Sequence, residues 1–285
     1  MNGWLIYDYN QYKKNKWFAD ELISRTSVFC DIKLIIVEHL RFGVSENTYF
    51  FMYDGVRVDA PDFAICRAIY PLLSRSLEMA GTRVFNDSRI STICNDKRLT
   101  YLTVTNSGIP IQKTFFYDTR FSPASNSVFI QYPYILKSAD GHGGNEVFWI
   151  SNEEEYRTSI NSIVSSGYLS QEICHTTGRD LRVYVLGGRI VASVLRSSDN
   201  FRSNYSLGGR IELISLSNKE VLIVKKILSL LPVIPDFVGI DFLVNDGEWV
   251  FNEIEDVVGT RMLYELTSLD IADLFSKHIH KEMTK

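Results

Sequence analysis

The sequence has only four cysteines, which lie far apart and form no C-x-x-C pair. This spacing argues against a disulfide framework and against a zinc site, and it is typical of a reduced, cytosolic protein. The chain also lacks any apolar run that approaches ~18 residues, and its N-terminus lacks a basic stretch followed by an apolar one. We therefore expect neither export nor membrane insertion, and we predict a cytoplasmic protein.

A block of one charge sign is absent as well, since 30 lysines and arginines stand against 34 acidic residues, for a net charge of -4. Proteins that bind the phosphate backbone usually carry a basic face, so nucleic acid is not expected as the main partner. No Ser-His-Asp or Cys-His signature indicates a covalent nucleophile. The 45% hydrophobic and 22% charged residues of this 285-residue chain are typical of a globular enzyme with two or three small lobes and a cleft between them.

Alternating strand and helix patterns fill the first part of the chain. Short apolar strands are expected at 4–7 and 32–37 and a periodic helix at 11–28, and the same pattern continues over 62–79. Strands that alternate with helices of this length favour βαβ units and a mostly parallel sheet. We predict an α/β lobe over residues 1–88.

Two α+β lobes are predicted to follow, over residues 89–168 and 169–285. The first contains a helix capped by Asn95 and another that begins with a capping box of Ser151 and Glu154. Its strands are expected at 114–117, 127–131, 134–137 and 147–150. The second contains a helix near 219–231, another from 270, and strands at 168–174, 181–186, 188–196, 237–244 and 248–255.

The last two predicted strands are joined by Asn-Asp-Gly at 245–247, a strong hairpin signal. A three-residue loop there sets Asp241 opposite Phe251 and diagonal to Glu253. Strand alternation adds Glu255 to the same face. The hairpin therefore predicts that three carboxylates converge.

Such a carboxylate cluster is unfavourable unless a cation lies among its oxygens. Hard oxygen ligands with open positions for phosphate are what magnesium prefers. The alternative is a solvated strand face, but Trp249 and Phe251 are expected on the same face and indicate that it is partly buried. Buried acids need a partner, so we predict a metal site.

A lysine and a glycine-rich turn form the second feature. Lys137 ends a predicted strand and precedes Gly141, Gly143 and Gly144. Glycines let backbone N–H groups approach phosphate oxygens, and the lysine adds a positive charge. The lysine precedes the glycines, so this is not a Walker A sequence, and such segments are often only turns. His142 is interpreted as a bystander in this loop.

Arginines gather around glycine pairs between residues 178 and 209 and form the third feature. Arg182 and Arg196 are expected on strands, where an arginine that faces a cleft holds carboxylate or phosphate oxygens in a bidentate manner. On an exposed strand face they are ordinary solvated residues. The order of all three features along the chain favours the cleft.

In chain order, these features resemble the successive motifs of the RimK-like ATP-grasp ligases. The similarity spans roughly residues 86–280, and its order is more specific than any single pattern. The residues at 3–6 are only loosely similar to the family's variable pre-grasp domain. The patterns are Lys97, Lys137 before the glycines at 141–144, Gln-Glu-Ile-Cys at 171–174, Gly-x-Asp-Leu-Arg at 178–182, Phe-Arg-Ser-Asn at 201–204 with Gly-Gly at 208–209, Gly-Ile-Asp at 239–241 and Asn-Glu-Ile-Glu at 252–255.

The resemblance implies an ATP-grasp fold in which two α+β lobes clasp ATP. Residues 1–88 are then the pre-grasp lobe, 89–168 the central lobe that carries the lid, and 169–285 the C-terminal lobe with the metal site. Lys97 and Lys137 are implied to reach the ATP phosphates. The other implied nucleotide-binding residues are Gly141, Gly143, Gly144, Glu172, Ile173 and Cys174 of the adenine hinge, Asp180, Arg182 and Ser203.

The same resemblance implies the catalytic and metal residues. Arg202 and Asn204 belong to a loop that holds the triphosphate and the acylphosphate, and we assign catalysis to them and to Arg196. The implied ligands of Mg²⁺, or of Mn²⁺ in its place, are Asp241, Glu253 and Glu255.

Two positions depart from the family pattern. Glu255 stands where the family usually has asparagine; an acid still binds magnesium, but the number of metal ions is then open. Val-Val-Gly-Thr-Arg at 257–261 replaces the Ser-Pro-Gly of many relatives. Arg261 is therefore either a contact to an acidic substrate group or a surface residue.

The function implied is an ADP-forming carboxylate–amine ligase that makes an amide bond through an acylphosphate. The substrates are an acid and an amine, either a free amino acid, a small metabolite or a peptide. Relatives commonly form dimers or tetramers, so a homo-oligomer is expected. The alternatives are a non-catalytic ATP-binding scaffold or sensor and a phosphotransferase that needs no amine.

Overall fold

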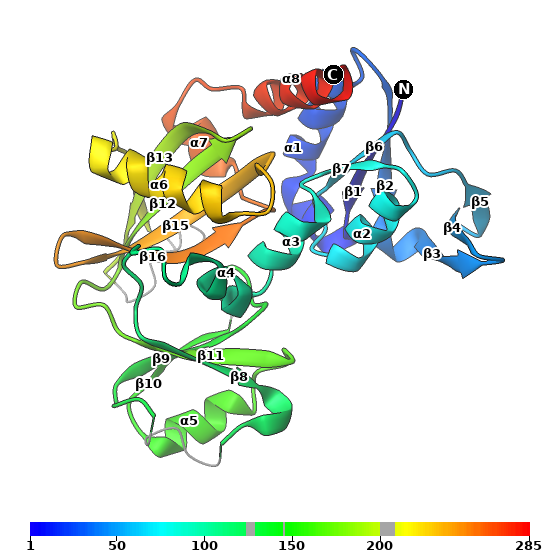
Figure 1. Ribbon diagram of the computed structural model, residues 1–285. Helices are drawn as coiled ribbons and strands as arrows, with labels where there is room; N and C mark the ends of the chain where they lie inside the picture. Colours follow the sequence, from blue (N-terminus) through cyan, green and yellow to red (C-terminus); the bar gives the residue numbers. More distant parts are fainter. Residues whose placement is uncertain (124–128, 145, 200–208) are drawn as a thin grey trace.

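The computed structural model describes residues 1–123, 129–144, 146–199 and 209–285. The N-terminal elements, blue to cyan in Figure 1, lie beside the C-terminal elements, yellow to red. The green strands β8 to β11 and the helix α5 form a separate layer below them. In the described ranges, no helix is both long enough and apolar enough to cross a membrane.

The N-terminal sheet is parallel, as the alternating pattern predicts, with strand order β2-β1-β6-β7. Strand β1 is buried almost throughout, which is typical of a parallel strand covered on both faces. Asp8 begins the first helix by accepting a hydrogen bond from the Gln11 N–H. The elements are β1 (Asn2–Tyr7), α1 (Tyr9–Thr26), β2 (Asp31–Ile36), β6 (Phe63–Cys66), α2 (Pro71–Met79) and β7 (Arg83–Phe85).

An antiparallel meander, absent from the sequence-based prediction, projects from this lobe. It comprises the 3-10 turn η1 (Val37–His39) and the strands β3 (Leu40–Ser45), β4 (Thr48–Tyr53) and β5 (Val56–Val58). Phe51 anchors it by packing edge-on against Trp4, with ring centroids 5.9 Å apart.

Two short helices, α3 (Ser88–Cys94) and α4 (Lys97–Val104), connect this lobe to the central layer. The prediction that Asn95 caps the second of them was wrong. Asn95 ends α3, and Asp96 caps α4 by accepting a hydrogen bond from the Arg98 N–H.

The central layer is an antiparallel sheet of order β10-β9-β11-β8 with α5 on one face. The helix begins one residue later than predicted, because Asn152 rather than Ser151 caps it by accepting from the Glu155 N–H. Residues 129–131 form a turn and an irregular segment instead of the predicted strand, whose residues 127–128 lie outside the described part. The elements are β8 (Thr114–Asp118), η2 (Thr119–Phe121), β9 (Tyr134–Ser138), β10 (Val147–Ile150), α5 (Glu153–Ile160) and β11 (Gly167–Glu172).

The C-terminal sheet is antiparallel, of order β14-β13-β12-β15-β16. Helices α3, α4 and α6 bury apolar residues against one of its faces. Phe18 and Phe63 of the N-terminal lobe share a core with Phe237 and Phe275, so the two outer lobes pack as one unit. The elements are β12 (Arg179–Leu186), β13 (Arg189–Ser197), β14 (Arg210–Leu213), α6 (Asn218–Leu230), β15 (Phe237–Asn245), β16 (Glu248–Glu255), α7 (Arg261–Leu266) and α8 (Ile271–Met283).

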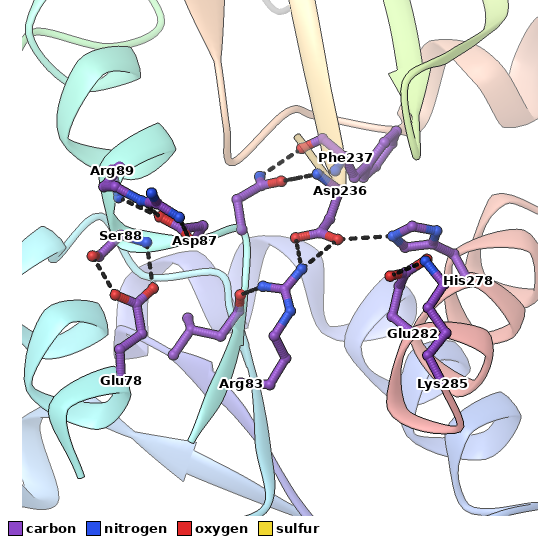
Figure 2. Close-up of polar contacts among 12 residues, drawn as sticks. Glu78, Arg83, Asp87, Ser88, Arg89, Asp236, Phe237, His278, Glu282 and Lys285 are labelled. Atoms are coloured by element: carbon purple, nitrogen blue, oxygen red, sulfur yellow. Dashed lines mark hydrogen bonds and ion pairs between the residues drawn. The ribbon is translucent and has the colours of Figure 1, made fainter. Parts of the chain in front are cut away.

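Polar contacts around the buried Asp236 hold the two outer lobes together. Figure 2 shows Asp236 between Arg83 of β7 and His278 of α8. Arg83 Nη2 lies 2.9 Å from both carboxylate oxygens, and His278 Nε2 lies 2.8 Å from Oδ1. The Asn86 side-chain amide also donates to the Phe237 carbonyl at 2.8 Å. These contacts tie three distant segments together.

Candidate functional site

Strand alternation places the charged residues of the C-terminal sheet on one face. On β15, Ile240 and Phe242 point into the core under α3, α4 and α6. Asp241, between them, therefore points to the opposite face. Arg182 on β12 lies directly opposite Asp241 in the ladder, and the apolar residues on either side of it again face the core.

The register of the terminal hairpin differs from the predicted one. Its turn has two residues, since Asn245 pairs with Glu248, and Asp241 lies directly opposite Glu253 instead of Phe251. The ladder shifts between Asp241 and Phe242, which leaves Asn252 as an extra residue in β16. Such a β-bulge reverses the alternation beyond it.

The bulge explains both an error and a success of the sequence-based prediction. Phe251 and Trp249 lie in and against the core under the helices, so they do not share a face with the carboxylates as predicted. The carboxylates still converge. One oxygen from each of Asp241, Glu253 and Glu255 lies within 4.8 Å of the others.

Two arginines contact acids of the carboxylate cluster, which we define as Asp241, Glu253 and Glu255. Arg182 donates to Asp241 at 2.8 and 2.6 Å and lies 2.8 Å from Glu255 Oε1. Arg196 donates to Asp180 and, at 2.8 Å, to Asp241 Oδ2.

Burial and the arginines act on the cluster in opposite directions. Burial acts to raise the pKa of Asp241, but the two guanidiniums override it and lower that pKa to about 2. Burial also acts to raise the pKa of Glu253, but the positive charges of Lys97, Lys137 and Arg182 together lower it. Burial prevails at Glu255 and raises its pKa.

The two predicted phosphate-binding lysines reach the same place from different elements. Lys97, at the start of α4, lies 3.4 Å from Glu253 and donates to the Gly141 carbonyl. Lys137, on β9, donates to the bulge residue Asn252 at 2.9 Å. Burial lowers the pKa of Lys137 to about 8. Both cations therefore stand beside the carboxylates, as the phosphates of a nucleotide would require.

A cleft between the central sheet and the C-terminal sheet brings together most of the predicted site. At Glu172 the chain leaves the central sheet, and 172–174 form one wall of the cleft. Cys174 accepts a hydrogen bond from Gln112 at 2.8 Å, and burial raises its pKa, which keeps the thiol neutral. The predicted residues that line the cleft are Lys97, Lys137, Gly141, Gly143, Gly144, Glu172, Ile173, Cys174, Asp180, Arg182, Arg196, Asp241 and Glu253.

A second cavity lies on the far side of the arginines. Arg182, Arg196 and Gly143 line both the cleft and this cavity. Glu255 lines the second cavity, not the cleft, so the carboxylate cluster spans the two. Arg261, considered above as a substrate contact, also lines the second cavity.

Three predicted residues, Arg202, Ser203 and Asn204, lie outside the described part of the chain. The roles assigned to them stay predictions.

Several residues of the site were missed or undervalued from the sequence. Arg67, from the N-terminal lobe, and Asp256, next to the cluster, both line the second cavity. His142 lines it too, and its Nε2 is buried without a hydrogen-bond partner among the described residues. Burial lowers the pKa of His142, so the imidazole is neutral at pH 7. Asn252 could have been predicted from the sequence, since it precedes Glu253 in the Asn-Glu-Ile-Glu pattern. No sequence pattern indicated Arg67.

Comparison with known proteins agrees with this geometry. Residues 94–279 match the RimK-like ATP-grasp domain. Beta-citrylglutamate synthase B of Mus musculus is 26% identical over 266 residues, which cover 87% of this chain and 68% of the mouse protein. Glutamate–LysW ligase ArgX of Sulfurisphaera tokodaii is 28% identical over 274 residues, 92% of this chain and 93% of that protein.

A solved structure shows the same fold at low sequence identity. D-alanyl-alanine synthetase A from Vibrio cholerae superposes with a TM-score of 0.76 at 13% identity. The superposition covers 100% of this chain and 99% of the Vibrio protein. The predicted ATP-grasp fold is thereby confirmed.

Proposed function

We propose a function from the premise that this chain belongs to the RimK-like ATP-grasp family of ATP-dependent amide-forming ligases. It activates a substrate carboxylate as an acylphosphate at the cluster of Asp241, Glu253 and Glu255. The nucleotide lies in the cleft between the central and C-terminal sheets, and the acid and amine lie in the second cavity. The observation that carries this proposal is the position of the carboxylate cluster. It stands where the two cavities meet, with Lys97 and Lys137 beside it.

The cluster fits a divalent cation of the size and hardness of Mg²⁺. Its donors are carboxylate oxygens from three residues within 4.8 Å of one another, and such hard ligands suit Mg²⁺, which also keeps positions for phosphate oxygens. Burial raises the pKa of Glu255, and an added positive charge would favour its ionised form. When bound, the ion would offset the negative charge of the phosphates and of the oxygen that attacks them.

The reaction then has two steps. A substrate carboxylate oxygen attacks the γ-phosphorus, and the bond from that phosphorus to ADP breaks. The amine nitrogen next attacks the acyl carbon, the bond to phosphate breaks, and the nitrogen loses a proton. Lys97 and Lys137 stabilise the negative charge of the phosphates. Arg196, which lines both cavities, is placed to hold oxygens of the phosphoryl group that is transferred from ATP to the substrate. Residues 138–144 close over the cleft and exclude water, which would hydrolyse the acylphosphate.

The substrates proposed are an amino acid or peptide amine and a carboxylic acid. The names of both relatives contain glutamate, which favours an amine of the glutamate type. Arg261, on the wall of the second cavity, is proposed as one contact to an acidic group of the substrate.

Calorimetric titration with a non-hydrolysable ATP analogue tests the site. We expect binding that requires Mg²⁺ and that weakens about tenfold to a hundredfold in Glu253→Gln and in Lys137→Met. Glu248→Gln, an exposed acid on the same strand, is the matched control and should bind like the wild type. Absence of binding to the wild type would overturn the proposal.

The product that accompanies ADP distinguishes the ligase from a phosphotransferase. With glutamate as amine and a panel of carboxylic acids that includes citrate and N-acetylaspartate, we expect ADP and an amide in equal amounts. ADP formed with a phosphorylated product that needs no amine would instead show a phosphotransferase.

A further inference from the structure

The second cavity contains a buried arginine whose charge the described part of the chain leaves without an ionic partner. Arg67 follows β6 and is 6% exposed. Its Nη2 donates to the Val258 carbonyl at 2.8 Å, and its Nε is buried without a hydrogen-bond partner. Among residues 1–123, 129–144, 146–199 and 209–285, no carboxylate forms an ion pair with it.

Three ionisable side chains lie near Arg67, those of Tyr7, Cys66 and Asp256, and none of them forms a hydrogen bond or an ion pair with it. Burial raises the pKa of Tyr7, with Arg67 opposing it, so the phenol stays neutral. The carboxylate of Asp256 is turned to another partner, since its Oδ1 accepts a hydrogen bond from Asn95 at 2.9 Å. A guanidinium stays charged at every physiological pH, and a buried charge without a partner is costly. An anion from outside the chain is the natural partner.

The Arg67 side chain is held ready for such an anion. Its guanidinium carbon lies 5.5 Å from the centroid of the buried Phe18 ring, and the Val258 carbonyl fixes one of its nitrogens. Contacts of this kind restrict the rotamer before a ligand arrives, so less conformational entropy is lost on binding. Its Nε has no hydrogen-bond partner among the described residues.

Arg67 and the carboxylate cluster lie on walls of one cavity. Glu255 of the cluster lines the cavity, together with Arg182, Arg196 and Arg261. Arg182 and Arg196 already bind carboxylates of the protein. Arg67 differs from them because no carboxylate of the described residues pairs with it, so it is free to hold a group of the substrate.

We propose that Arg67 binds a carboxylate of the substrate that does not react and thereby directs the reacting group toward the cluster. This inference rests on the proposed function. The ligand class is an α-amino acid or a dicarboxylic acid, since each carries a carboxylate besides the group that reacts. Arg67 lies before residues 94–279, the part that matches the family domain, so the N-terminal lobe supplies this specificity.

Binding to the full chain saturated with Mg²⁺ and the ATP analogue tests the inference in two arms. The amine arm compares glutamate with 4-aminobutyrate, which lacks the α-carboxylate. The acid arm compares succinate with succinamate, in which one carboxylate is an amide. Each probe is titrated into the wild type, Arg67→Gln, Arg67→Lys and the control Arg57→Gln, which removes an exposed arginine of the meander.

The wild type should bind glutamate or succinate more tightly than the matched analogue, and the arm that discriminates identifies the source of the carboxylate. Arg67→Gln should weaken that probe about tenfold to a hundredfold and leave its analogue unchanged. Arg67→Lys keeps the positive charge but loses the bidentate geometry of the guanidinium, so we expect an intermediate loss of affinity for that probe. Arg57→Gln should bind every probe like the wild type.

Two outcomes overturn the inference: equal binding of both carboxylate probes by wild type and Arg67→Gln, or no discrimination by the wild type in either arm. Retained affinity for the ATP analogue shows that Arg67→Gln is folded. If Arg67→Gln does not fold, Arg67→Lys replaces it in the test. Binding of the carboxylate probe by Arg67→Lys that equals the wild type would then overturn the inference. Loss of analogue binding by the wild type itself would instead overturn the proposed function.

Discussion

Arg182 binds Asp241 through two of its nitrogens, at 2.8 and 2.6 Å, and the same guanidinium lies 2.8 Å from Glu255. The arginine thus holds two acids of the cluster together. Both partners are buried, with side-chain exposures of 7% for Arg182 and 1% for Asp241. Removal of the arginine alone therefore leaves buried negative charge without compensation.

We expect Arg182→Gln to lower the free energy of unfolding by about 3 kcal/mol in the presence of a chelator. Added Mg²⁺ should restore part of that loss, because a cation among the carboxylates replaces the lost charge. Urea unfolding with EDTA and with Mg²⁺ measures both effects. Arg189→Gln, an exposed arginine on β13, is the control, and equal stability of the two variants would contradict the expectation.

The affinity for the ATP analogue should depend on pH through Lys137. Burial lowers the pKa of Lys137 to about 8, and the protonated form attracts phosphate. The affinity should therefore be highest below pH 8 and fall as the pH rises through about 8, where the ammonium loses its proton in the free protein.

Calorimetric titrations across this pH range check the lysine. Lys137→Arg keeps its charge and should shift the fall to higher pH, whereas Lys137→Met should bind weakly with no fall near pH 8. Lys14→Met, an exposed change on α1, should reproduce the wild-type profile. A fall near pH 8 that persists in Lys137→Met would assign it to another group.

Asp236 should matter for stability and not for nucleotide binding. It is buried between Arg83 and His278, as Figure 2 shows, and does not line the cleft. We expect Asp236→Ala to lower the free energy of unfolding by about 2 kcal/mol, because Arg83 and His278, which belong to different lobes, lose their shared hydrogen-bond partner. Thermal and urea unfolding measure this loss.

Asp273→Ala is the control for this network. Asp273 pairs with Lys277 on the surface of α8, and such a pair contributes about 0.5 kcal/mol. If Asp236→Ala weakened the affinity for the ATP analogue while the protein stayed folded, the joint would be coupled to the cleft and our separation of the two would be wrong.

Glu255 should tolerate asparagine better than Glu253 tolerates glutamine. Burial raises the pKa of Glu255, whereas Lys97, Lys137 and Arg182 together lower that of Glu253 despite its burial. An amide oxygen still serves as a hard ligand. Glu255→Asn should therefore keep Mg²⁺-dependent binding of the ATP analogue within about tenfold of the wild type, with Glu253→Gln weaker still. The reverse order would show that Glu255 is the principal ligand.

Much of this site was readable from the sequence because its parts are local. Apolar alternation around Asp241 and the Asn-Asp-Gly turn predicted a hairpin with three converging acids, and the acids do converge. The lysine before the glycines and the arginine in the 178–182 pattern lie on the strands that alternation predicted. Short-range periodicity and turn chemistry determine such features.

The predictions from the sequence were wrong where the structure depends on features that sequence periodicity does not show. The bulge at Asn252 changed the register, so Phe251 entered the core instead of facing the acids. The capping side chains of α4 and α5 proved to be Asp96 and Asn152, in each case one residue beyond the expected position. Neighbouring polar residues compete as caps, and tertiary packing selects among them.

The sequence by itself determined the terminal hairpin, the strands that carry the site and the residue types proposed to hold ATP and a divalent cation, because these depend on neighbours along the chain. Only the tertiary structure decided which charges meet. It placed Arg67 of the N-terminal lobe in the cavity that Glu255 lines, although the two are far apart in sequence. It also left Arg67 without a carboxylate partner among the described residues. Burial and pairing are properties of packing between lobes, and a linear pattern carries no record of them.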